Sequence, residues 1–262
     1  MPLTIEHGVA RDLFTYMSRS EHLDSMALVR VQATNAAYHH PNGAGVPDHP
    51  SVPHQRWFDV YVTTPLGPCG LRRIRAISCD DQNSAEQGGF HDTNDIVTHC
   101  STIRRAIDVS PAFHSTDHGV VTLSWDRCGP PGMWPGPMPL SEPFTSIDEV
   151  SMDTVADLYA RIRETATTES GPAGIAQSLL DQKIMTVEST AGDDTAQLTS
   201  RVIIALGSLG FIGGDVMRVS VSPSWVRLDT RLGTVLAQRR QRLNLLTLPK
   251  RTTPNTDEKA RG

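Results

Sequence analysis

Histidine and cysteine, the residues best suited to metal binding and nucleophilic chemistry, are confined to the first half of this chain. All ten histidines and all four cysteines lie within the first 128 of the 262 residues. Any chemistry based on imidazole, thiolate or a soft metal ion is therefore expected in residues 1–128. The second half carries a different signal, because it becomes strongly basic towards its end.

The most specific local pattern runs from His114 to His118. Its two histidines flank Asp117, and the spacing resembles the HxxEH signature of inverzincin metalloproteases, with Asp in place of Glu. That motif needs a helix, whereas Pro111 precedes this pattern and Gly119 follows it. We therefore favour a polar loop, and a metal site formed by His114, Asp117 and His118 is the alternative.

A second constellation lies on a helix that we expect over residues 92–109, with Asp92 as its N-cap. Asp95 and His99 would then share one helical face, and a carboxylate that orients an imidazole can produce a general base. The simpler interpretation is that the acidic residues cap the helix and complement its dipole. Asp95 and His99 are thus catalytic candidates only in an alternative reading.

The remaining histidines and the cysteines match no known site. Residues 39–55 combine turn formers with four histidines and predict a long loop, in which a water-facing role for the imidazoles is favoured over a metal site. The cysteines are Cys69, Cys79, Cys100 and Cys128, and their spacing fits neither a zinc ribbon nor a CxxC redox motif. We expect reduced thiols.

Several enzyme classes lack their signatures. The chain has no GxSxG nucleophile motif and no GxxxxGK[ST] phosphate loop. Gly207, Gly210 and Gly213 follow a predicted helix, whereas a dinucleotide site needs glycines between a strand and a helix. We expect no cofactor, and the sequence leans away from an enzyme.

A basic end is the main feature of the second half. Residues 216–251 contain eight basic residues and a single acid, Asp229, although the whole chain has a net charge of −5. Such a surface can neutralise nucleic-acid phosphates or bind an acidic protein neighbour. The predicted binding residues are Arg227, Arg231, Arg239, Arg240, Arg242, Lys250 and Arg251.

Hydrophobic periodicity predicts mixed secondary structure in the first half. Apolar residues four apart indicate a helix over residues 4–18. Strands are expected at 26–33, 57–64, 71–79 and 120–125, and the turn at 65–68 makes the middle two a hairpin.

Residues 129–139 hold Gly or Pro at eight of eleven positions and are the best candidate boundary. We divide the chain into a His/Cys-containing α+β region (1–128), a Pro/Gly-rich connection (129–145), a helical region with a basic end (146–251) and a polar tail (252–262). One single domain overall is the alternative.

In the second half, Ser146 and Glu149 form a capping-box pattern that predicts a helix to about residue 167. Further helices are expected at 172–182 and from residue 193 or 194 to 206, with strands at 184–188 and 217–228. Pro223 interrupts the last of these, which is therefore an edge strand or two short strands. Residues 234–246 fit either a strand or a basic helix. The sequence shows no internal repeat.

The predicted fold class is α+β, with antiparallel strands mainly in the N-terminal half, helices in 146–206 and a strand-containing basic C-terminal end. The preferred function is a non-enzymatic structural subunit of a larger particle, such as a virion shell or another multi-subunit complex. It would act through protein–protein surfaces as a homo- or hetero-oligomer, with non-specific nucleic acid as a further partner.

The alternative function is a metal-dependent hydrolase. Its ligands would come from His39, His40, His91, His99, His114 and His118. Charged residues interrupt the first twenty positions, so we expect no signal peptide, no membrane partner and cytoplasmic synthesis.

Overall fold

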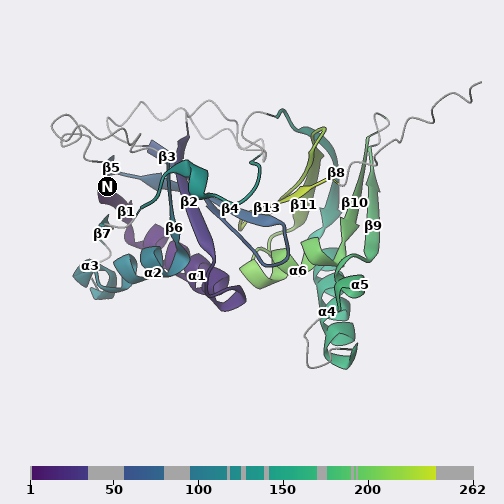
Figure 1. The fold of residues 1–262 in the computed structure, drawn as a ribbon, viewed down its shortest axis with the longest axis horizontal. Helices are drawn as coiled ribbons and strands as arrows, with labels where there is room; N and C mark the ends of the chain where they lie inside the picture. Colours follow the sequence, from purple (N-terminus) through teal and green to yellow (C-terminus); the bar gives the residue numbers. More distant parts are fainter. Residues whose placement is uncertain are drawn as a thin grey trace, which may run out of the picture.

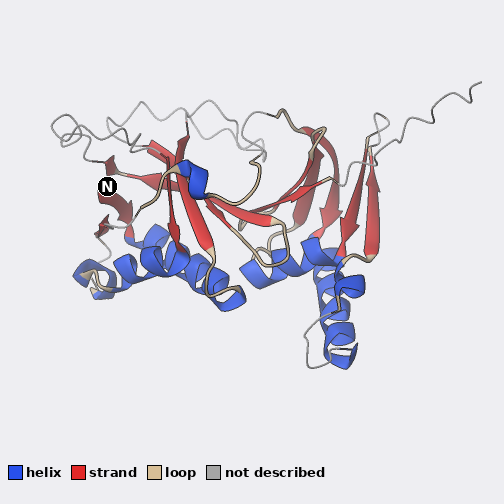
Figure 2. Cartoon of the chain, viewed as in Figure 1, coloured by secondary structure: helices blue, strands red, loops and turns tan. Residues whose placement is uncertain are grey.

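The chain folds into antiparallel sheets with helices gathered along one side, as a computed structural model shows (Figures 1 and 2). The structure describes residues 2–34, 56–79, 95–116, 119–124, 128–138, 142–169, 176–189, 192 and 194–239. The predicted α+β class is confirmed. The division of the chain at residues 129–145 stays a prediction.

Four times along the chain, a strand runs directly into a helix. The four pairs are β1 (Pro2–Glu6) with α1 (His7–Leu23), β6 (Asp95–His99) with α2 (Cys100–Asp108), β8 (Thr145–Ser151) with α4 (Met152–Glu169), and β10 (Thr195–Thr199) with α6 (Ser200–Leu209). Glu6, His99 and Thr199 keep extended backbones before their helices, and none makes a side-chain capping bond. The helices α1, α2 and α6 therefore begin without the side-chain capping bond that stabilises many helix starts.

Each helix is followed by a strand that packs back on the same half. These strands are β2 (Leu28–Thr34), β7 (Val120–Ser124), β9 (Lys183–Glu188) and β11 (Val216–Val221). The first and fourth units continue as meanders through β3 (Arg56–Val62) and β4 (Cys69–Ala76), and through β12 (Trp225–Asp229) and β13 (Thr234–Gln238). The shorter elements are β5 (Ser78–Cys79), α3 (Pro111–His114), the 3-10 turn η2 (Pro131–Met133) and α5 (Gln177–Leu180).

The strand pairings follow the same plan in both halves. In the first half β1 pairs with β7 and β2 with β6, and in the second half β8 pairs with β11 and β10 with β9, all antiparallel. In each half, the first strand of one unit thus pairs with the strand after the helix of the other unit. The structure is internally repeated although the sequence shows no repeat.

The two halves join edge to edge. β4 pairs with β13, with Thr234 opposite Leu71 and Leu236 opposite Cys69, which produces an eight-stranded sheet in the order β6-β2-β3-β4-β13-β12-β11-β8. At this seam, Gly70 leaves room for Tyr16 of α1 and Leu209 of α6, whose atoms lie 2.7 and 2.5 Å from where a Cβ would stand. Helices from both halves consequently meet over the seam.

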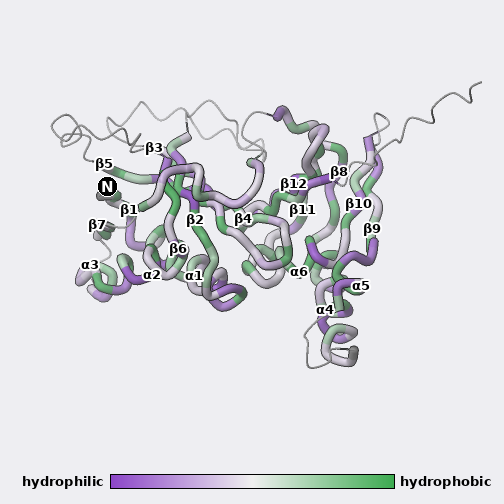
Figure 3. The backbone as a smooth tube through the Cα atoms, viewed as in Figure 1, coloured by the Kyte–Doolittle hydropathy of each residue, from purple (hydrophilic) through white to green (hydrophobic). Residues whose placement is uncertain are grey.

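The main core lies between the helices and the sheet faces that they cover. Leu13 and Met17 of α1, Ile103 of α2 and Ile203 and Leu206 of α6 are almost fully buried there. In Figure 3 the chain of β2 is mostly hydrophobic, whereas the helices below it alternate between hydrophobic and hydrophilic stretches. This alternation is what one buried helical face requires.

Several predicted elements are wrong at their starts. Residues 95–99, 146–151 and 195–199 are expected in helices but form strands, and the first helix begins at His7 after a strand. With no Gly, Pro or loop between strand and helix, the apolar positions of the strand merge into the helical pattern that follows.

Three other expectations have mixed outcomes. Only Gln177–Leu180 is helical within the described part of the predicted helix 172–182. Residues 217–228 form two short strands, β11 and β12, as the second alternative predicted, and both are interior rather than edge strands because β8 and β13 flank them. Residues 234–238 are a strand, whereas the rest of 234–246 beyond Arg239 and the predicted loop 39–55 lie outside the described residues.

The remaining predicted strands are confirmed. The hairpin of β3 and β4 forms as expected, as do the strands predicted at 26–33, 120–125 and 184–188, with small shifts at their ends.

Candidate interaction surface

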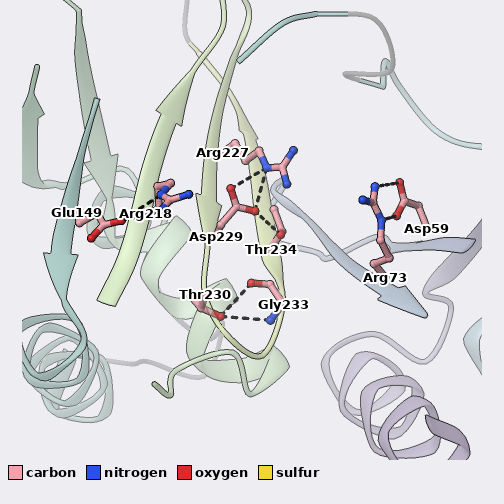
Figure 4. A network of polar contacts seen from close by, with 9 residues as sticks. All are labelled: Asp59, Arg73, Glu149, Arg218, Arg227, Asp229, Thr230, Gly233 and Thr234. Carbon is pink, nitrogen blue, oxygen red and sulfur yellow. Dashed lines mark hydrogen bonds and ion pairs between the residues drawn. The ribbon is translucent and has the colours of Figure 1, made fainter. Parts of the chain in front are cut away.

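A row of arginine–carboxylate pairs crosses the face of the eight-stranded sheet that the helices do not cover. We call these pairs the arginine–carboxylate row: Arg30–Asp95, Arg73–Asp59, Arg227–Asp229 and Arg218–Glu149. The pairs come from both halves of the chain, and Figure 4 shows three of them. Arg218 lies opposite Asp229 in the strand register, which puts these two pairs on the same face.

The pairs are made of short, mostly two-pronged hydrogen bonds. Arg73 donates to both carboxylate oxygens of Asp59, at 2.7 and 2.9 Å. These hydrogen bonds raise the pKa of the Arg73 guanidinium above its usual value. Asp229 accepts two bonds from Arg227 and a third, 2.6 Å long, from the Thr234 hydroxyl. Buried charges of this kind need their partners, so the row fixes the strands in place.

A cavity of about 170 Å³ opens where the two halves meet. Asp59, Arg72 and Arg73 line it from the first half, and Arg227, Asp229 and Arg231 line it from the second half. Arg73 and Arg227 pair with the two lining aspartates, and Arg72 pairs with Asp12 of α1, so most of the positive charge around this cavity is neutralised. Since its walls come from both halves, its shape depends on the seam between β4 and β13.

An apolar strip borders the row on the same face. It consists of Tyr61, Cys69, Leu71, Val97, Trp225 and Leu236. Trp134, from the predicted Pro/Gly-rich connection, packs on this strip with its ring centroid 6.5 Å from that of Tyr61, in an edge-on arrangement. The connection therefore rests on the sheet at this point.

Glu142 forms a second contact between the connection (129–145) and the sheet. Its carboxylate accepts hydrogen bonds from the Ser222 hydroxyl and from the backbone N–H of Ser224, in the turn between β11 and β12. These bonds lower the pKa of Glu142 below its usual range, the bond from Ser222 having the largest effect.

The buried cysteines are unsuited to nucleophilic chemistry. Burial raises the pKa of the Cys69 thiol and of the Cys100 thiol to about 12. Both remain protonated near neutral pH, and the thiol is a poor nucleophile compared with the thiolate. Cys128 is exposed.

The structure separates the predicted general-base pair. Asp95 and His99 lie on strand β6 and not on a helix, so four residues put them roughly 13 Å apart along the strand. Asp95 instead binds Arg30 at 2.7 and 2.5 Å and accepts a bond from Gln32.

The other predicted metal ligands are only partly described. His114 contacts the backbone carbonyl of Asp108 at 2.6 Å, while Asp117 and His118 lie outside the described residues, as do His39, His40 and His91. Among the residues that the structure describes, no group of three His, Cys, Asp or Glu side chains could hold a metal ion.

The predicted basic binding residues have different environments. Arg227 is paired with Asp229 and lies over the Phe144 ring, and Arg239 donates to the backbone carbonyls of Ser222 and Thr195. Arg231 is exposed. Arg240, Arg242, Lys250 and Arg251 lie outside the described residues.

Sequence reasoning missed most of the row, including Arg30, Asp59 and Arg73. The available signal was a charged residue at the centre of each strongly apolar predicted strand. Such residues are uncommon in sheets unless they are paired across strands.

Comparisons with known proteins agree with this architecture. The model of a family described as "Domain of unknown function (DUF8185)" matches residues 139–242, which is less than half of the chain. No curated protein matches the sequence. Many solved structures do match.

The DNA polymerase sliding clamp of Caulobacter crescentus aligns with a TM-score of 0.53 at 15% identity, over 91% of this chain and 65% of the clamp. The DNA polymerase beta subunit of Streptococcus pyogenes aligns with a TM-score of 0.51 at 8% identity, over 91% of this chain and 64% of that subunit. The chain has the fold of a sliding clamp. It spans slightly less than two thirds of the length of these clamps, and at such identities the likeness concerns the fold alone.

No helix in the described part of the chain is long and apolar enough to cross a membrane.

Proposed function

We propose that this chain is a non-enzymatic assembly subunit that associates end to end with further copies of itself through free strand edges at its two ends. The observation that carries the proposal is the position of those edges in a sliding-clamp-like fold. Within the described residues β7 pairs only with β1, and β9 pairs only with β10. Figure 1 shows β7 and β9 at opposite ends of the molecule.

The edge of β7 is poorly protected against pairing. Natural edge strands usually carry charges, prolines or bulges that prevent association. β7 has the sequence VVTLS without a charged residue, and Val120 is 48% exposed. An exposed, uncharged edge of this kind is suited to pairing with another chain.

The chain already contains one join of this type. The seam between β4 and β13 connects two halves by antiparallel pairing of edge strands. Pairing of β7 in one copy with β9 in the next would repeat such a join between molecules. Because the two edges differ, the contact is head-to-tail, and it generates a ring where the rotation closes or a filament where it does not.

The finer identity of the assembly is also a proposal. The similar structures are named as sliding clamps and beta subunits of DNA polymerase, and a clamp is the finer form of assembly that we propose. The virion shell expected from the sequence is another assembly built from repeated contacts, but no specific observation favours it.

Nucleic acid is the proposed further partner, through the basic C-terminal segment. The helices are a weaker candidate than this segment for non-specific binding of nucleic acid. The described helices carry seven arginines and seven carboxylates, so their formal charges cancel. Exposed Arg231 and the basic residues that follow it would provide most of the positive charge for phosphate or for an acidic neighbour.

A matched pair of substitutions tests the edge contact. Val120→Lys places a charge on β7, whereas Val109→Lys makes the same change at a site that is 71% exposed and lies after α2. By light scattering we expect Val120→Lys to shift the mass towards the 28.6 kDa monomer and Val109→Lys to keep the wild-type mass. Equal masses for both variants and the wild type would refute the role of β7.

A further inference from the structure

We propose that a groove on the helical side of the molecule binds a phosphate monoester with an apolar body, through Arg19 and Arg163. The groove lies between α1, α4 and α6 and holds about 580 Å³, within the usual range for small-molecule sites. It forms within one chain, so the inference does not depend on end-to-end association.

The walls of the groove are largely apolar. Phe14 and Leu23 of α1 and Tyr159 of α4 provide carbon surface, and hydroxyls of Thr15 and Ser18 lie among them. Phe14 and Tyr159 are only partly buried. Such walls favour the apolar part of a ligand over a bare inorganic ion.

Two guanidinium groups face this groove without a carboxylate partner. Eight described arginines each pair with an acidic side chain, whereas the groove arginines belong to a second group, which also includes Arg11 and Arg161, for which no ion pair forms within the described residues. Within the described part of the chain, Arg19 and Arg163 have no such partner, and no acidic residue lines the groove. The imidazole of His22 is also in the lining.

Both arginines are exposed, and each guanidinium is oriented by one or two neighbours. Arg19 donates to the carbonyl of Leu209 at 3.4 Å and lies directly over Gly210, which ends α6 with a φ of 76°. Arg163 lies over the Tyr159 ring, 5.8 Å from its centroid, and that ring packs on Gly207. Positioned guanidiniums lose less freedom on binding an anion.

The charge favours phosphate over carboxylate. A phosphate monoester carries roughly −1.5 to −2 near pH 7 and offers three acceptor oxygens, enough for two guanidiniums. A carboxylate carries only one negative charge. The phosphate could come from a free organophosphate or from the 5′ end of a nucleic-acid strand, and the test separates these sources.

Matched variants on the same helices provide the test. Arg19→Ala and Arg163→Ala remove the groove cations, whereas Arg11→Ala and Arg161→Ala remove exposed arginines from α1 and α4 that do not line the groove. By ³¹P NMR titration with phenyl phosphate, we expect each groove variant to weaken binding about tenfold or more, because hydrogen bonds to charged groups are strong. The control variants should bind like the wild type.

A second variant keeps both arginines. Thr15→Glu puts a carboxylate one helical turn from Arg19, where it can neutralise the guanidinium. It should abolish most of the phenyl phosphate binding while thermal unfolding stays near that of the wild type. Retained binding in Thr15→Glu would contradict the assignment of Arg19.

Other probes define the ligand. Benzoate has the same ring with one charge, and inorganic phosphate has the charge without the ring, so both should bind more weakly than phenyl phosphate. Groove-dependent binding of a 5′-phosphorylated oligothymidine, but not of its unphosphorylated form, would identify a strand end as the source. The proposal is overturned if phenyl phosphate does not bind, if benzoate binds equally well, or if groove and control variants weaken binding alike.

Discussion

Arg73 on β4 holds Asp59 on β3 by two parallel hydrogen bonds of 2.7 and 2.9 Å, next to the seam where the two halves join. Asp59 is 8% exposed, so its charge has little access to water. The pair holds β4, the strand that forms the seam with β13, in position. It thereby also positions the wall of the cavity that both halves share.

Removing one partner of this pair should be costly. Asp59→Ala leaves Arg73 without its acceptor, and we expect a loss of roughly 1–3 kcal/mol in the free energy of unfolding, because removal of one hydrogen-bonding partner leaves the other unsatisfied. Urea denaturation measures this loss.

The control lies two residues along β4. Arg75 pairs with Glu6 where both side chains are 41% or more exposed, so Arg75→Ala should cost less than about 1 kcal/mol. Equal losses for Asp59→Ala and Arg75→Ala would show that burial of the row has no energetic importance.

The packing at the seam should be equally sensitive. In Gly70→Val, the new side chain would collide with Tyr16 and Leu209, which are 1% exposed and have little room to move. We expect the free energy of unfolding, measured by thermal unfolding, to fall by about 1–3 kcal/mol, as is typical of an overpacked core. Gly8→Ala meets nothing within 4 Å and should leave stability unchanged or raise it.

The Glu142 contact predicts an acid-sensitive attachment of the connection. The pKa of Glu142 is lower in the folded chain than its ordinary value of 4.5. A carboxyl with a lowered folded pKa stabilises the fold above its unfolded pKa, and this stabilisation disappears as the pH falls through the folded pKa.

The Glu142→Gln variant should therefore be less stable than the wild type near neutral pH. This difference in stability should shrink as the pH falls below the ordinary pKa of a glutamate carboxyl, 4.5. Urea midpoints of both proteins at several pH values test this. A difference that stays constant with pH would contradict the role of the Glu142 charge.

Thiol reactivity should follow burial. In a Cys79→Ser background, Cys128 should react quickly with an aromatic disulfide reagent near pH 8, because it is exposed. Cys69 and Cys100, with pKa values raised to about 12, should react only after unfolding. Rapid reaction of three thiols in the native protein would show that these two sites are accessible.

The sequence predicts the fold class and the isolated strands well. The hairpin of β3 and β4 has a clear turn between two β-rich segments, and both strands form as expected. It fails at the junctions where β6, β8 and β10 continue into helices. Those junctions lack Gly and Pro, and no side-chain cap forms before α2 or α6, so pairing with distant strands, such as β6 with β2, decides where the strand ends.

The candidate surface was harder to predict than the fold. Arg227 was predicted as a binding residue, whereas Asp229 was noted only as the single acid of the basic end. The bond from Thr234 to Asp229 and the pair Arg73–Asp59 each lie within one hairpin, and they depend on which residues stand opposite each other across its two strands. The groove arginines Arg19 and Arg163 lie 144 positions apart in the sequence, and no local pattern relates them. Their proximity follows from the meeting of α1, α4 and α6.

Native mass spectrometry of the wild-type chain at micromolar concentration tests the central claim most directly. We predict species of two or more 28.6 kDa subunits, a single one for a closed ring and a series for a filament, which revert to monomer in the Val120→Lys variant. A wild-type chain that remains a 28.6 kDa monomer at all concentrations would contradict end-to-end assembly.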